Sequence, residues 1–146
     1  DGGFTGNPTI TPLVRECESD DTILVSINPI ERPGTPRTAM EIQNRLNEIS
    51  FNSPLIKELR MAALLRQVAD PGTGEGAVWA KMRIHRVAGE EVMLKLGYSS
   101  KMLAGWAFFQ MLRDGGRRAA EAFLETYGAD IGVRSTLNID HLLTEV

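Results

Sequence analysis

One short run of residues limits the fold of this chain more than any other feature. Thr22–Ile27 is almost entirely apolar and rich in β-branched side chains, and Asp20 and Asp21 stand directly before it. Such a run is typical of a β-strand that is covered on both faces, as strands of parallel sheets are. The next segment, residues 28–36, contains three prolines and a glycine, which exclude regular structure there. We therefore expect a buried strand followed by a loop.

Helical patterns dominate the next part of the chain. Thr38 and Glu41 have the spacing of a capping box, and apolar residues recur along one face over 39–49. Ser53 and Pro54 predict the start of a second helix, because serine is a good N-cap and proline suits the first turn. That helix should continue to about residue 69.

The second half of the chain predicts one more strand and two more helices. The strand is expected over Met82–Val87. Ser100 is predicted to cap a strongly apolar helix over 101–113, and apolar residues cover so much of its circumference that we expect it to be well buried. Gly115 and Gly116 predict its end, and a last helix is expected over 117–126, terminated by Gly128.

Composition narrows the functions that remain. The length of 146 residues suits a single domain. The formal net charge of -3 and the lack of a Lys/Arg block argue against a nucleic-acid partner. No apolar run approaches the roughly 20 residues of a membrane span. Cys17 is the only cysteine, so an internal disulfide is excluded and a reducing compartment such as the cytoplasm is expected.

The motif with chemical content opens the sequence. Asp1-Gly2-Gly3 is followed by Phe4 and, after two residues, by Asn7-Pro8. This order resembles the end of the catalytic core in patatin-like hydrolases, where Asp-Gly-Gly or Asp-Gly-Ala precedes an aromatic residue and Asn-Pro. Further segments in the same order resemble the C-terminal half of bacterial patatin-like proteins of a subgroup with an extra C-terminal region; they are 23–27, 26–36, 99–101, 106–109, 112–117 and 119–120.

The resemblance implies a fold and a reaction. The fold would be the C-terminal part of a three-layer α/β/α hydrolase, with residues 1–36 ending the catalytic core and 37–146 forming a mostly helical region. The family hydrolyses lipid acyl esters with a Ser-Asp dyad and without a metal or cofactor. Asp1 would be the base, and Gly2 and Gly3 would shape its loop. Contact with a membrane surface would accompany such a substrate.

The partner of Asp1 is not found in this sequence. A nucleophile elbow needs Gly-x-Ser-x-Gly, and the nearest match, Gly97–Lys101, has lysine in place of the last glycine. We therefore expect the serine and the oxyanion loop on an N-terminal segment of the same protein. The alternative is a non-catalytic helical module for interaction or self-association. A hydrolase that uses its own first residue is disfavoured, because such enzymes begin with Ser, Thr or Cys.

Three further groups of residues lead to weaker predictions. Gly72–Ala77 fits G-x-G-x-x-A, but a helix rather than a strand is expected before it, so a flexible surface loop is predicted instead of a dinucleotide site. His85 is expected to be a surface or partly buried strand residue. Several arginines could either line a site for anionic head groups or form scattered ion pairs, which is the more common role; they are Arg32, Arg37, Arg83, Arg86, Arg117 and Arg118.

Overall fold

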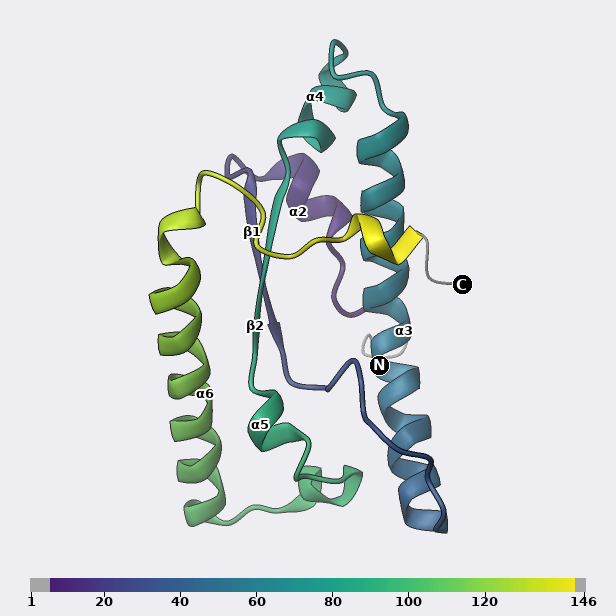
Figure 1. Cartoon of the computed structure of the whole chain (residues 1–146), viewed down its shortest axis with the longest axis vertical. Coiled ribbons are helices and arrows are strands. Elements are labelled where there is room, and N and C mark those ends of the chain that lie inside the picture. Colours follow the sequence, from purple (N-terminus) through teal and green to yellow (C-terminus); the bar gives the residue numbers. More distant parts are fainter. Residues whose placement is uncertain (1–5, 144–146) are drawn as a thin grey trace.

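The computed structural model describes residues 6–143, which form a mixed α/β arrangement in which helices predominate (Figure 1). Two strands, β1 (Asp21–Ser26) and β2 (Arg83–Ala88), stand between the long helices α3 (Ala39–Val68) and α6 (Trp106–Tyr127). The α/β class expected from the sequence is thus confirmed at this coarse level. The two parts of the motif-based division, 1–36 and 37–146, meet in this sheet, because β1 belongs to one and β2 to the other.

The sheet is parallel, with Asp21 opposite Arg83 and Ser26 opposite Ala88. Parallel strands need a long crossover connection, and here α3 and α4 (Gly74–Lys81) provide it. The second strand predicted over 82–87 is confirmed with a shift of one residue. The core lies where α3 packs against the inner face of the sheet, and its buried members are Ile10, Leu24, Leu55, Leu59, Ala62, Ala63, Trp79, Met82, Ile84 and Ile139.

Within residues 6–143, β1 is covered on one face only, which corrects the prediction of a fully covered strand. Leu24 is buried, whereas its neighbours Ile23 and Val25 are 48% and 76% exposed. Successive side chains of a strand point to opposite faces. The apolar run therefore supplies one side chain to the core and presents its other face, together with Ile27, to the surface.

Helix α3 begins as predicted but does not stop where predicted. Glu41 donates its backbone N–H to Thr38 Oγ1 at 3.2 Å, and its carboxylate accepts from the Thr38 N–H at 3.0 Å. The hydrogen bonds from the Arg37 and Thr38 amides lower the pKa of the Glu41 carboxyl. The predicted break at Ser53-Pro54 is wrong, because the Ser53 hydroxyl donates back to the Ile49 carbonyl inside one continuous helix instead of capping a new one.

The apolar stripe at the start of α3 does not join the core. Ile42, Leu46 and Ile49 are each about half exposed, at 46%, 55% and 56%. The buried side chains of this helix belong to its second half, from Asn52 to Ala63. The amphipathic pattern thus predicts the helix correctly, but its first apolar face is only partly covered within residues 6–143.

Helix α4 occupies the segment predicted to be a flexible loop. Thr73 caps it by accepting from the Gly76 N–H at 3.0 Å, and Asp70 holds the preceding turn through the Gly72 N–H at 2.8 Å. Gly76 sits against that turn: a Cβ there would overlap the backbone carbonyl of Asp70 and lie 2.8 Å from Thr73 Oγ1. The glycine thus allows the turn and the helix to approach each other closely.

We expect the substitutions Gly76→Ala and Gly74→Ala to have opposite effects on stability. Gly76→Ala must displace rigid backbone and should lower the free energy of unfolding by about 2 kcal/mol. A Cβ at Gly74 meets nothing within 4 Å, so Gly74→Ala should stabilise the protein by about 0.5 kcal/mol by restricting the unfolded chain. Urea denaturation of both variants measures the difference, and equal effects would contradict the tight contact at Gly76.

The second half of the chain departs from the prediction at Ser100 and at Gly115-Gly116. Residues 98–102 form a short 3-10 helix, η1, with the Ser100 N–H donating to Gly97 O, so Ser100 does not cap an α-helix. Helix α6 starts at Trp106 and runs unbroken through Gly115 and Gly116. Gly115 is buried, and a Cβ there would lie 2.8 Å from Val92 Cγ2, on α5 (Glu90–Met93). This glycine therefore serves close packing rather than helix termination, whereas Gly128 ends α6 as predicted.

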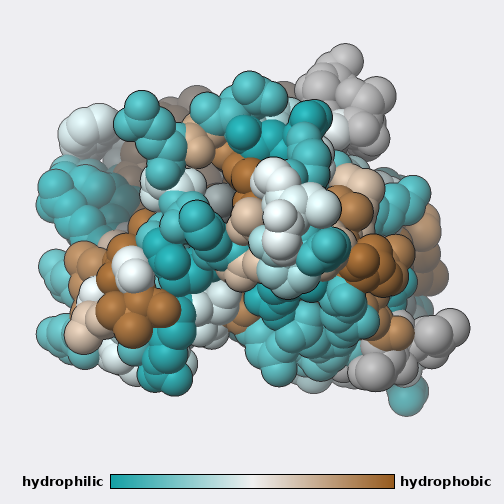
Figure 2. All heavy atoms as spheres, turned by 90° about the horizontal axis from the view of Figure 1, so that it is seen from above, coloured by the Kyte–Doolittle hydropathy of each residue, from teal (hydrophilic) through white to brown (hydrophobic). Residues whose placement is uncertain are grey.

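Much of the apolar surface of the chain is exposed, contrary to the burial predicted for residues 101–113. Met102, Trp106 and Phe109 are 85%, 72% and 47% exposed. Seen along the long axis from the α4 end, apolar patches stand among hydrophilic side chains (Figure 2). Within residues 6–143, no helix combines the length and the apolarity needed to cross a bilayer.

Candidate functional site

The residues with predicted catalytic roles, Asp1, Gly2 and Gly3, lie outside the described part of the chain. The described part begins at Gly6 and includes the Asn7-Pro8 pair of the motif. The candidate site is therefore built from the segment that carries the end of the motif and from the surfaces beside it.

One carboxylate fixes the segment just after the motif. Glu58, on α3, accepts hydrogen bonds through Oε2 from the Ile10 N–H at 3.0 Å, the Thr11 N–H at 3.2 Å and the Thr11 hydroxyl at 3.1 Å. These groups stand at the start of α2 (Thr11–Glu16), whose first amides have no partner within the helix. Ile10 itself is 1% exposed in the core. The polypeptide is thus attached to α3 a few residues after the motif.

Replacing Glu58 with alanine should detach this segment. Loss of the shared acceptor leaves two amides and a hydroxyl without their partner, so we expect about 2 kcal/mol of destabilisation. Hydrogen exchange should show the amide protons of Ile10 and Thr11 losing protection, more than those of β2. Glu58→Gln retains one acceptor oxygen and should have a smaller effect. Unchanged protection of both amides in the alanine variant would contradict the anchoring role.

A cavity of about 320 Å³ adjoins the motif segment. Asn7 and Pro8 line one side of it, and residues of β1, Phe51 and Lys101 line the others. Residues 22–28, from both faces of β1, therefore border a hollow that lies immediately beside the end of the motif.

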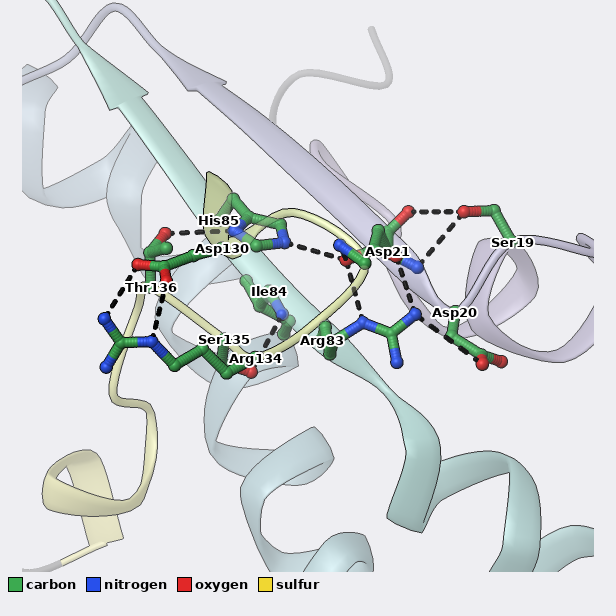
Figure 3. A network of polar contacts seen from close by, with 11 residues as sticks. Ser19, Asp20, Asp21, Arg83, Ile84, His85, Asp130, Arg134, Ser135 and Thr136 are labelled. Atoms are coloured by element: carbon green, nitrogen blue, oxygen red, sulfur yellow. Dashed lines mark hydrogen bonds and ion pairs between the residues drawn. The ribbon is translucent and has the colours of Figure 1, made fainter. Parts of the chain in front are cut away.

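A second polar cluster joins the sheet to the loop after α6 (Figure 3). Asp21 Oδ1 accepts from His85 Nε2 at 2.9 Å, from Arg83 Nε at 2.9 Å and from the Gly132 N–H at 3.0 Å, while Oδ2 pairs with Arg83 Nη2 at 2.7 Å. His85 Nδ1 lies 3.0 Å from Thr136 Oγ1. When Nε2 carries the imidazole proton, Nδ1 accepts from the threonine hydroxyl.

The order hydroxyl, imidazole, carboxylate resembles a nucleophile with its base and orienting group, but the surroundings favour a structural role. His85 is 0% exposed, and both of its ring nitrogens are engaged, Nε2 by Asp21 and Nδ1 by Thr136. The Arg83 guanidinium, with help from His85 and the Gly132 amide, holds the pKa of the Asp21 carboxyl well below its usual range. The prediction of a surface or partly buried His85 is therefore wrong.

The arginines considered as an anion site have acidic partners where the structure gives their contacts. Arg32 binds Glu48 through two nitrogens and donates to the Leu94 carbonyl at 2.7 Å. Arg83 pairs with Asp21, and Arg86 pairs with Glu90 at 2.7 Å. For these three, the ion-pair interpretation holds. Within residues 6–143, no three His, Cys, Asp or Glu side chains gather as a metal site would require.

Glu58 and the Asp21 cluster were not found by sequence reasoning. In the sequence, Asp21 is one of two acidic residues that precede a strand. Its pairing depends on the parallel register that places it opposite Arg83. Glu58 bonds to residues 47 and 48 positions away. Comparison of the chain with protein-family models, curated proteins and solved structures found no match.

Proposed function

We propose that this chain supplies the base of a lipid acyl hydrolase, with Asp1 acting on a serine that belongs to an N-terminal segment of the same protein. The serine would attack the ester carbonyl, and the aspartate would accept its proton. Gly2 and Gly3 would allow the backbone path that brings the carboxylate to the serine. Chemistry of this kind requires neither a metal nor a cofactor.

The observation that carries this proposal is the open side of β1. Parallel sheets occur almost only with both faces covered, and two strands alone are a marginal sheet. Within residues 6–143, β1 pairs only with β2, and it leaves Ile23, Val25 and Ile27 exposed. Further polypeptide packed on β1 would bury these side chains and would lie beside the Asn7-Pro8 end of the motif loop.

The test is reconstitution from two parts. The 146-residue chain alone should not react with a fluorophosphonate probe for activated serines. Co-expression with the N-terminal segment of the parent protein should produce a labelled serine on that segment, and Val25→Asp should reduce the labelling by adding a charge to the proposed interface. Glu121→Gln, a change on an exposed helix surface, serves as the control. A purified two-part complex without labelling would contradict the hydrolase proposal.

A second candidate rests on a different surface. The half-exposed stripe Ile42, Leu46 and Ile49 on α3 is the kind of face that a helical interaction or self-association module uses. In that case the chain alone should form a defined oligomer in light scattering, and Leu46→Glu should return it to a monomer. The hydrolase proposal does not require self-association through this stripe.

A further inference from the structure

A cavity of about 270 Å³ lies just past the carboxyl end of β1 and is also lined by residues that follow β2. Ile27, Asn28 and Pro29 reach it directly after β1, and Met93 and Leu96 reach it after β2. In open α/β sheets, ligands bind in the crevice outside the carboxyl ends of the strands. Its place in the fold therefore makes this cavity a candidate ligand site whose lining contains no residue of the Asp1 motif.

The walls of the cavity are mainly apolar. Helix α6 contributes Phe108, Phe109 and Leu112, and the segment before it contributes Leu103. The volume of about 270 Å³ is just below the usual range for ligand cavities, which suits one alkyl chain better than a branched or two-chain molecule. A hydrocarbon tail would be stabilised here because each of its methylenes leaves water.

Among residues 6–143, one cation borders the cavity without forming a salt bridge. Lys101 Nζ lies 4.3 Å from the centroid of the Phe51 ring and 5.8 Å from that of Tyr98, so two aromatic faces position it. The carboxylate in the wall, Glu48, is held instead by Arg32 at 2.6 Å. The charge that the cavity offers to a ligand is therefore the positive charge of Lys101. Lys101 also lines the cavity beside Asn7-Pro8, so it stands between the two hollows.

From this arrangement we infer that the cavity binds a single-chain carboxylate amphiphile, with the tail among the α6 side chains and the carboxylate on Lys101. All residues named for this site lie within 6–143, so the ligand would bind there whether or not Asp1 acts as a base. It extends to any single-chain acid of this type, whether it is a free fatty acid or the acid released by ester hydrolysis.

Calorimetric titration of the 146-residue chain tests the inference with three ten-carbon probes used below their micelle concentrations. Decanoate should bind with one-to-one stoichiometry, decanol about threefold to fivefold more weakly, and decyltrimethylammonium more weakly still, because an exposed ion pair contributes up to about 1 kcal/mol. Lys101→Gln should reduce the affinity for decanoate to that for decanol. Lys95→Gln, which alters an exposed lysine outside the cavity, should change neither affinity.

A variant of the wall locates the binding site. Leu103 is 55% exposed, so Leu103→Asp should fold normally, yet it places a charge where the tail would lie and should weaken decanoate binding about tenfold or more. Saturable binding with equal affinity for all three probes, or decanoate binding that Lys101→Gln leaves unchanged, would overturn the assignment of the carboxylate to Lys101. Absence of saturable binding would overturn the assignment of the cavity. Neither result would alter the expectation for serine labelling in the two-part complex.

Discussion

Replacing Asp21 with alanine is expected to lower the free energy of unfolding by about 3 kcal/mol, because the change removes the common partner of three donors. His85, which is 0% exposed, would lose the acceptor for Nε2. Arg83 would keep the more distant Asp20, at 3.7 Å, and the Gly132 amide would lose its 3.0 Å hydrogen bond. The loop that carries Thr136 and Ile139 would consequently be held less firmly against the sheet.

Chemical denaturation at neutral pH measures this effect, and its pH dependence provides a second check. The pKa of Asp21 is lowered in the folded state, so its contribution is present above the unfolded-state pKa of about 3.9 and is lost as the pH falls. The difference in the free energy of unfolding between wild type and Asp21→Ala should therefore become smaller below about pH 4. Asp114→Ala removes a half-exposed partner of Arg113 and should change stability by less than about 0.5 kcal/mol. Similar losses in both variants would contradict the central role of Asp21.

The second large effect is expected in the full-length protein, where Asp1→Asn should lower kcat/KM for an acyl ester by about 10² to 10⁴. Asparagine has nearly the same shape but cannot accept the proton of the serine hydroxyl. Binding of the substrate should change little, so the loss should appear mainly in kcat. Hydrolysis of a chromogenic fatty-acyl ester measures it, and unfolding curves should show that the variant remains folded.

Asp114→Asn is the matched control for Asp1→Asn, because it makes the same chemical change at an ion pair on the surface of α6. Its esterase activity should equal that of the wild type. Near-normal activity of the Asp1→Asn variant would remove Asp1 from the reaction, whatever the structural role of its loop.

Local signals in the sequence were reliable where neighbours along the chain decide the structure. The capping box of Thr38 and Glu41 is an example, because both partners lie within one helical turn. Pro54 and Gly115 led to wrong predictions, because contacts with distant parts of the chain decide the structure there. Each has a local preference for ending a helix, but α3 continues through Pro54 beside buried Asn52 and Leu55, and α6 uses Gly115 to approach Val92.

The candidate site was less predictable than the helices. The motif at Asp1 suggested a chemistry, but no periodic pattern could show that Glu58 would anchor Ile10 or that Lys101 would stand between two cavities. Such contacts depend on how α3 and η1 come to lie beside segments distant in the chain. The exposure of Val25 could not be predicted either. The sequence of an apolar strand is the same whether the molecule itself or another polypeptide covers it.

The parallel pairing of Asp21 with Arg83 also determines the order in which the molecule can be made. During synthesis β1 leaves the ribosome before all of α3 and α4, so its pairing with β2 must wait for a segment 62 positions further along. Helix α3 can form from neighbouring residues in that interval, whereas the sheet requires closure of a long loop and forms late. Until then the edge of β1 that binds β2 stays unpaired, and an unpaired strand edge is prone to aggregate.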